Sequence, residues 1–296
     1  MLRRCALVML LTCVGLSAQA QGPAVKLAWK FKEGDKFYLE NVTALKQVVK
    51  IMGQEIPTET VNTTVSSFKV TKVAADEIVM EQKIESTKIK GGQPGPQAMM
   101  AEQMVGTVLT VTLNGKGEVT KVGGFDALIK KLSQDNEEAG KLLKFLLTED
   151  TMKQGIQEAF AFVPDKPVSK GDSWKRQMKV SMGPMGTFII DQQYTLEGVN
   201  KEGAELAVKG AYSFQAPKGD GGGGLPFKIT KGDFKTDDAK GTLIFDPVAG
   251  RLVSQVYKSK LKGTLTIAIG DQEAQMELNQ DTDTKIRVMD KWQKDL

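Results

Sequence analysis

Cysteine is confined to the start of the chain, and histidine is absent from it altogether. The only two cysteines are Cys5 and Cys13. Without further thiols or any imidazole, the chain cannot build a disulfide framework, a nucleophile activated by histidine, or a zinc, copper or haem site with Cys or His ligands. We therefore expect a non-enzymatic protein without a cofactor or a metal, stabilised by its hydrophobic core.

Long apolar runs are also missing after the first twenty residues. Arg3 and Arg4 precede an apolar run at 6–16, and Ala18 and Ala20 form an Ala-x-Ala cleavage pattern at the usual distance. These are the parts of a secretory signal peptide. We expect residues 1–20 to be removed near Ala20, and the mature protein to be periplasmic or extracellular.

Two alternatives for this N-terminal segment fit less well. A transmembrane anchor needs roughly 20 apolar residues, and the run at 6–16 is about half that length. A lipoprotein would use Cys13, but Thr12 is a poor residue to precede a lipidated cysteine. The sequence thus predicts no integral membrane span in the mature chain.

Neither sign of charge dominates. The chain has 40 basic and 36 acidic residues, and losing Arg3 and Arg4 would lower its formal charge from +4 to about +2. No basic block interleaved with aromatic residues is present, and aromatic residues make up 6% of the chain. Nucleic acid is therefore not expected as a partner.

The remaining pattern is dominated by long strands. Segments such as 56–73, 78–90, 187–199 and 251–269 are rich in β-branched residues or alternate between apolar and polar ones, and they exceed the usual strand length of about five or six residues. Length of this kind favours twisted antiparallel ribbons in a curved sheet. We expect a mainly β protein with a central helical insert (α+β), whose two repeated halves form a half-barrel or a paired-sheet architecture.

The helical insert occupies residues 126–163, between an N-terminal β half at 21–125 and a C-terminal β half at 164–296. Asp135 is a candidate N-cap for the second of three expected helices. Apolar residues at helical spacing form a stripe that we expect to line or cover an apolar groove: Leu128, Leu132, Leu142, Leu146, Ile156 and Phe160.

Acidic residues form no convincing catalytic or calcium site. The candidates lie at expected turns, where carboxylates cap backbone amides and stay solvated. They are Glu33, Asp35, Asp172, Asp233, Asp237 and Asp238. The glycine-rich run at 219–224 lacks the Lys-Ser/Thr of a phosphate-binding loop, so we interpret it as a flexible connection.

Two pairs of segments indicate an internal repeat. Residues 31–37 and 168–174 share a pattern of an apolar residue, two polar residues, Gly, Asp, any residue and an aromatic residue. Two hairpins, near 106–120 and 241–254, recur at nearly the same offset. The markers of the first pair are Gly34, Asp35, Phe37, Gly171, Asp172 and Trp174.

The segments at 29–37 and 164–174 resemble a family of uncharacterised exported bacterial proteins. The specific part of this resemblance is a Pro-x-x-Pro-Val-x-x-Gly-Asp-Ser-Trp segment that begins at Pro164. The family has no assigned activity, so the resemblance transfers no catalytic or binding residues. The expected architecture is similar to that of periplasmic lipid and lipoprotein carriers, by analogy of fold alone.

Two functions follow as hypotheses. The first is an exported envelope protein that binds a lipid or other apolar ligand in a groove between curved sheets and helices. The alternative is a structural or protein-interaction module of the cell envelope, which binds a partner protein and no small molecule.

Overall fold

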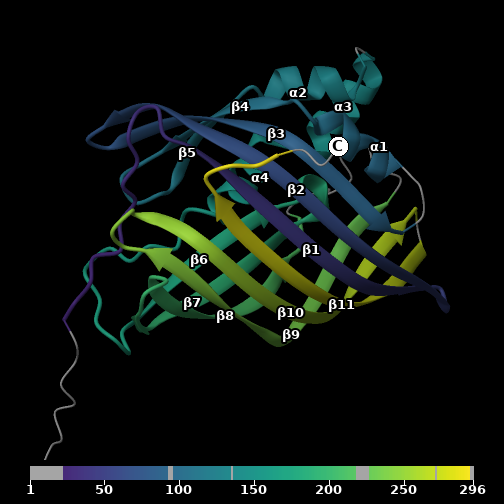
Figure 1. The fold of residues 1–296 in the computed structure, drawn as a ribbon. Coiled ribbons are helices and arrows are strands. Elements are labelled where there is room, and N and C mark those ends of the chain that lie inside the picture. The colour runs from purple at the N-terminus through teal and green to yellow at the C-terminus, as the bar shows by residue number, and fades with distance from the viewer. Residues whose placement is uncertain (1–22, 93–95, 135, 218–226, 271, 294–296) are drawn as a thin grey trace, which may run out of the picture.

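In a computed structural model, the described part of the chain forms a single antiparallel sheet of eleven strands with four α-helices (Figure 1). The structure describes residues 23–92, 96–134, 136–217, 227–270 and 272–293. The strands are β1 (Lys36–Ile51), β2 (Gln54–Ala74), β3 (Glu77–Gly91), β4 (Val108–Leu113), β5 (Val119–Gly123), β6 (Ser173–Ser181), β7 (Thr187–Val199), β8 (Ala204–Gln215), β9 (Lys228–Asp246), β10 (Arg251–Ile269) and β11 (Gln272–Met289). Their order across the sheet is β5-β4-β3-β2-β1-β11-β10-β9-β8-β7-β6, so the sheet stays open between β5 and β6.

The two halves of the chain share this one sheet. β1 pairs with β11 from Tyr38↔Met289 to Ile51↔Met276, which joins the hairpins of the first half to those of the second. The expected mainly β class and the long curved antiparallel strands are confirmed. A paired-sheet arrangement is wrong, because pairing between the first and last strands makes the sheet continuous.

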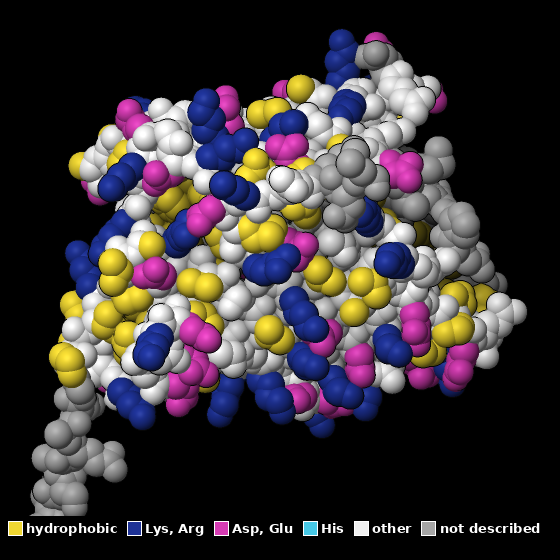
Figure 2. Space-filling view, viewed as in Figure 1, with side chains coloured by type: hydrophobic (Ala, Val, Ile, Leu, Met, Phe, Trp, Pro, Cys, Tyr) yellow, Lys and Arg dark blue, Asp and Glu magenta, His cyan; other side chains and the backbone are white. Residues whose placement is uncertain are grey.

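The sheet is strongly curved, and its two faces differ in chemistry (Figure 1). Large apolar residues such as Phe37, Val111, Leu206 and Phe245 are buried on the inner face. Lysines and carboxylates alternate over the outer face. Figure 2 shows them interspersed on the side of the molecule in view. Cross-strand ion pairs such as Lys260–Asp281 (3.0 Å) link neighbouring strands there. Exposed pairs of this kind stabilise a fold by about 1 kcal/mol at most, so burial on the inner face holds the sheet in shape.

Four helices connect β3 to β6 on either side of the β4–β5 hairpin. They are α1 (Pro96–Met104), α2 (Phe125–Leu132), α3 (Glu137–Leu146) and α4 (Glu149–Gln157). Asn136 caps α3 by accepting a hydrogen bond from the Ala139 amide, and Thr148 caps α4 by accepting one from the Thr151 amide. The expected cap Asp135 lies outside the described residues. No helix in the described part of the chain is long and apolar enough to cross a membrane.

A short segment after α4 crosses the inner face and joins its two apolar cores. Phe160 packs with Phe37 and Phe68 of the first half, whereas Phe162 packs with Tyr194 and Phe245 of the second. Both phenylalanines are at most 2% exposed. The apolar cores of both halves thus pack against this one segment, residues 159–163, which we call the wedge.

Two tryptophans clamp this wedge through its backbone. The Trp29 indole donates to the Phe160 carbonyl at 3.0 Å, and the Trp174 indole donates to the Phe162 carbonyl at 2.7 Å. A buried indole N–H needs such a partner. These two hydrogen bonds therefore hold the backbone of the wedge in place on the inner face of the sheet.

The turns before β1 and β6 have the same geometry. In the first turn, Asp35 Oδ2 accepts from the Lys32 amide at 2.7 Å, and Gly34 has φ 89°. In the second, Asp172 Oδ2 accepts from the Ser169 amide at 2.8 Å, and Gly171 has φ 90°.

The aromatic residues that follow these turns also correspond. Phe37 stacks on Phe68 of the neighbouring strand with ring centroids 5.1 Å apart, and Trp174 stacks on Tyr194 at 5.8 Å. Each pair contacts one side of the wedge, through Phe160 and Phe162 respectively. Phe37 and Trp174 thus both stack on an aromatic residue of the neighbouring strand, although Phe37 is buried and Trp174 is only partly buried.

Strand β9 corrects one expectation. It carries Asp233, Asp237 and Asp238, which were expected at turns, and it continues through 235–242. The small residue Gly241 makes this possible, because a Cβ there would lie 2.1 Å from the Val256 carbonyl oxygen and 2.9 Å from the Tyr257 Cα. Close approach of β9 to β10 keeps a polar stretch in the sheet, with its charges on the outer face.

Candidate functional site

A hollow of about 320 Å³ lies between the inner face of the sheet and α4. Its walls are mostly apolar on the helix side and mixed on the sheet side. The lining residues come from β1, β2, β3, β4 and β11, and from α1, α4 and the wedge: Leu39, Asn41, Thr64, Ser66, Phe68, Gln82, Ile84, Met104, Leu109, Met152, Gly155, Ile156, Glu158, Ala159, Phe160 and Ile286. Its volume lies at the small end of the range for ligand pockets, roughly 300–1,000 Å³.

Helix α4 covers the hollow and lies between the two open edges of the sheet. It contacts both β5 and β6, and Thr151 and Gln154 tie it to the end of β6 through the backbone of Ser181, at 2.8 and 3.0 Å. None of its described residues is fully buried. A helix with so little buried surface is among the parts of a fold that open most easily.

Glu158 places one carboxylate in this hollow. It is the C-cap residue of α4, where the negative end of the helix dipole opposes a negative charge. Glu158 is an exposed residue that opens into the hollow, and partial desolvation by the surrounding protein raises the pKa of its carboxyl group above the ordinary value. It makes no hydrogen bond or ion pair with any residue that the structure describes.

A second acceptor in the hollow also lacks a partner. Gln82 on β3 donates from Nε2 to Ser66 Oγ at 3.4 Å, whereas its Oε1 is buried without a hydrogen bond among the described residues. A buried polar atom left in this state costs roughly 1–3 kcal/mol. Gln82 Oε1 is thus a buried acceptor without a partner among the described residues, and it lines the same hollow as the exposed Glu158 carboxylate.

Three tyrosines of the second half lie within reach of the Glu158 charge. Tyr194 and Tyr257 are buried, and burial raises the pKa of both phenols. Burial also raises the pKa of Tyr212, and the negative charge of Glu158 acts in the same direction on all three. The neighbourhood of Glu158 is therefore rich in neutral hydroxyls and rings.

The structure brings only some of the predicted groove residues to this hollow. Ile156 and Phe160 line it. Leu128 and Leu132 are buried in α2 and are not among its lining residues. The side chains of Leu142 and Leu146 lie outside the described part of the chain.

The repeat markers lie elsewhere. Gly34, Asp35, Gly171 and Asp172 form the two turns described above, and none of them lines the hollow. The residues that sequence reasoning missed are Glu158 and Gln82. For Glu158 a signal existed, since it is the one charged residue among Ile156, Ala159 and Phe160 in an otherwise apolar stretch.

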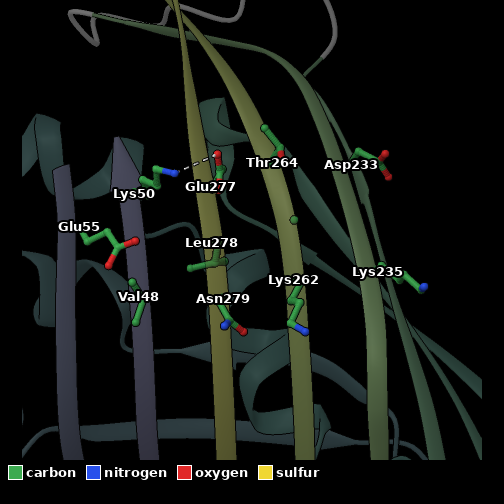
Figure 3. Close-up of a pocket in the computed structure, with 11 residues that line it drawn as sticks. Val48, Lys50, Glu55, Asp233, Lys235, Lys262, Thr264, Glu277, Leu278 and Asn279 are labelled. Atoms are coloured by element: carbon green, nitrogen blue, oxygen red, sulfur yellow. Dashed lines mark ion pairs between the residues drawn. The ribbon is translucent and has the colours of Figure 1, made fainter. Parts of the chain in front are cut away.

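A second depression, of about 700 Å³, lies on the outer face over β9, β10, β11 and β1 (Figure 3). Figure 3 shows Lys50 paired with Glu277, whose charged atoms are 3.9 Å apart. Lys262 is paired with Asp237 of β9 at 2.7 Å. Charges that already have partners and remain solvated gain little from a ligand, so the inner hollow is the better candidate.

No group of three or more His, Cys, Asp or Glu side chains suited to a metal occurs among the described residues. A metal would also need several ligands around Glu158, and the other residues lining the hollow supply no second carboxylate. The chemistry available in the hollow is hydrogen-bond acceptance, one negative charge and apolar contact.

Comparison with known proteins identifies a family but no activity. The model of a family of unknown function, DUF6263, matches residues 58–242, which is more than half of the chain. This match agrees with the resemblance to an uncharacterised family seen in the sequence. No curated protein matches the chain.

Solved structures resemble the chain only distantly. A structure described as lipid–protein interactions in lipovitellin has 8% identity and a TM-score of 0.42, and the match covers 90% of this chain but 26% of that one. DynF from Micromonospora chersina has 11% identity and a TM-score of 0.18, with 90% and 85% of the two chains covered. The outer membrane protein OprG from Pseudomonas aeruginosa has 8% identity and a TM-score of 0.16, with 87% and 97% covered. The chain spans about a quarter of the lipovitellin chain, and likenesses this remote define no ligand for it.

Proposed function

The chain belongs to DUF6263, a family of unknown function, and we propose that it is a non-enzymatic binding protein that holds a small, largely apolar ligand in the hollow beneath α4. One observation supports this most strongly. The inner face is not filled by its own side chains, and a cavity of about 320 Å³ remains beside the wedge. A hollow of this size offers a ligand apolar surface that would otherwise face water.

The lining favours a ligand with an apolar body. Apolar side chains reach the hollow from both the sheet and the helix, among them Leu39, Ile84, Met152 and Ile156. Burying apolar surface against them would contribute about 25 cal/mol per Å². Met104 and Met152 add adaptable walls, since thioether side chains adjust to ligands of different shape.

We also propose that the protein acts outside the cytoplasm. The basis is the signal-peptide pattern of residues 1–20, with cleavage near Ala20. A carrier in that compartment would take up its ligand when α4 moves from the sheet edges, which its limited burial permits. Catalysis is not proposed, because Glu158 is the only titratable residue lining the hollow and has no adjacent base or nucleophile.

The alternative of an interaction module rests on a different observation. Strands β5 and β6 are the edges of the sheet, and free strand edges are common sites of protein association. Helix α4 contacts both of these edges, so it limits the access of a partner strand to them. The hollow is therefore the stronger basis for a function.

We further propose that the two halves are copies of one unit. Support comes from the matching Gly-Asp turns at Gly34 and Gly171 and from the stacked pairs Phe37–Phe68 and Trp174–Tyr194. In that arrangement strands β1–β5 correspond to β6–β10, and β11 is the additional strand that joins the copies.

A cavity-filling variant tests the binding function. Gly155 lines the hollow, and a Cβ built on it meets no atom within 4 Å. We expect N-phenyl-1-naphthylamine, a neutral apolar dye, to bind the wild-type protein with a rise in fluorescence, and Gly155→Phe to weaken binding by about tenfold or more through loss of space.

The matched control is Gly198→Phe. Gly198 also has no atom within 4 Å of a built Cβ, but it lies on β7 and does not line the hollow. This control should bind the dye as the wild type does. Equal dye binding by the wild type and both variants, or none by the wild type, would contradict the proposed function.

A further inference from the structure

The hollow is lined by polar groups as well as by apolar side chains, and these polar groups narrow the kind of ligand that it can bind. Two acceptors without a partner among the described residues face the same hollow: Gln82 Oε1 of β3 is buried, and the Glu158 carboxylate at the end of α4 is exposed. The buried Gln82 oxygen is costly to leave unpaired, and the negative charge of Glu158 attracts a cation. Together they favour a ligand that supplies hydrogen-bond donors.

The polarity of the sites limits the choice of ligand. Both unpartnered atoms accept hydrogen bonds, and Gln82 already uses its Nε2 as a donor to Ser66. Glu158 is the only charged residue among those that line the hollow. A ligand with a carboxylate or phosphate would place its charge beside Glu158, whereas a cationic donor would complement it.

The neighbouring rings also favour a cation. Phe68 and Phe160 also line the hollow, with their ring centroids 5.7 Å apart in an edge-to-face arrangement. Aromatic faces attract ammonium groups, most strongly where water is excluded. Asn41 and Thr64 add neutral acceptors on the sheet wall.

We propose that the hollow recognises a primary ammonium group carried on an apolar chain, and that Glu158 and Gln82 accept its hydrogen bonds. An ammonium has three N–H donors and no acceptor, so it matches a hollow whose unpartnered polar atoms are acceptors. The apolar chain then lies against Ile84, Met152 and Ile156. This inference rests on the proposed binding function and names the chemistry of its ligand.

Three probes of equal chain length separate the head groups. Octylamine, 1-octanol and octanoate would each displace N-phenyl-1-naphthylamine from the wild-type protein at neutral pH, in titrations followed by fluorescence. Octylamine should bind roughly 10- to 100-fold more tightly than 1-octanol, as expected for a charge-assisted hydrogen bond. Octanoate should bind most weakly, because its charge has the same sign as that of Glu158.

Glu158→Gln keeps the size of the side chain and removes its charge. It should abolish the preference for octylamine while changing the affinity for 1-octanol by no more than about threefold. Gln82→Leu should lower octylamine affinity by a smaller factor, since a neutral acceptor contributes less than a charged one. The control is Glu149→Gln, an exposed carboxylate in the first turn of the same helix, which should bind all three probes as the wild type does.

The outcomes distinguish the two proposals. If 1-octanol and octylamine displace the dye equally from the wild type, or if Glu158→Gln retains the amine preference, the ammonium site is wrong although the hollow still binds ligands. If the dye does not bind the wild-type protein, the proposed function fails first. Loss of binding in both Glu158→Gln and Glu149→Gln would assign the effect to the stability of α4 and would also overturn the ammonium site.

Discussion

Single residues in this protein are placed at a cost to stability where the hollow is formed. Glu158 ends α4 with a carboxylate that has no partner in the described part of the chain, and its desolvation raises the pKa of the carboxyl group. Residues held in such states are common at functional sites, where pKa values depart from the ordinary range. The negative charge of Glu158 in turn raises the pKa of the phenols of Tyr194, Tyr212 and Tyr257.

The pH dependence of stability follows from the direction of that pKa shift. A carboxyl group whose pKa is raised in the folded state stabilises the fold below its ordinary pKa of about 4.5. This contribution disappears as the pH rises through the raised value. The lowered pKa values of Asp165, Asp237 and Asp290 act in the opposite sense, at lower pH.

We therefore expect Glu158→Gln to become more stable relative to the wild type as the pH rises from 4.5 to neutral. The gain in melting temperature at neutral pH should be about 2–4 °C for each kcal/mol of charge burial removed. Thermal unfolding of both proteins across this pH range measures it. A constant difference at every pH would show that Glu158 titrates as an ordinary surface carboxylate.

The sequence contained part of this site. Ile156 and Phe160 were predicted from helical spacing and do line the hollow. Leu128 and Leu132 have the same spacing but are buried in α2, because periodicity identifies an apolar face without saying what covers it. Gln82 could not have been found, since its role depends on which strands the fold brings together.

At the scale of elements, the sequence predicted the turns and the long strands better than it predicted where a strand continues through a polar stretch. The long strands and the helical insert follow from alternation and from capping residues. Asp233, Asp237 and Asp238 of strand β9 were expected at turns, because the middle of this strand carries charges and the small residues Ala239 and Gly241. Tertiary packing against Tyr257 overrides the weak local propensity there.

The matching turns before β1 and β6 allow a paired prediction. Gly34 and Gly171 have φ values of 89° and 90°, and a Cβ on either meets no atom within 4 Å. Gly34→Ala and Gly171→Ala should each destabilise the protein by about 1–2 kcal/mol, because the only cost is the left-handed backbone conformation.

Chemical denaturation of the two alanine variants provides the measurement. Gly155→Ala is the control, since it lies in a helix with free space and should be neutral or slightly stabilising. A difference of more than about 1 kcal/mol between the two turn variants would argue against equivalent roles in the two halves.

At the scale of the whole molecule, the wedge and the first and last strands make the two halves one structural unit. β1 pairs with β11 over most of its length, and Phe160 and Phe162 each complete the core of a different half. The repeat visible in the sequence divided the chain at Pro164, yet the sheet is continuous across both halves. Sequence periodicity could not reveal this, because pairing between β1 and β11 joins residues far apart in the chain.

Unfolding should accordingly occur in one cooperative transition. Neither half can expose its side of the wedge without also losing the pairing of β1 with β11. Differential scanning calorimetry of the mature protein should give a calorimetric enthalpy equal to the van't Hoff enthalpy. Two resolved transitions would instead indicate halves that fold separately.

The claim on which this account depends is that the hollow beneath α4 receives a ligand with its ammonium group at Glu158. The most direct measurement is a crystal structure of the protein soaked with 8-bromooctylamine, in which the bromine is located by anomalous scattering. We predict a bromine peak among Met104, Met152 and Ile84, with the ammonium group at hydrogen-bond distance from Glu158 and Gln82 Oε1. A bromine peak only in the outer depression over β9–β11, or no peak in the hollow at a saturating concentration, would contradict the account.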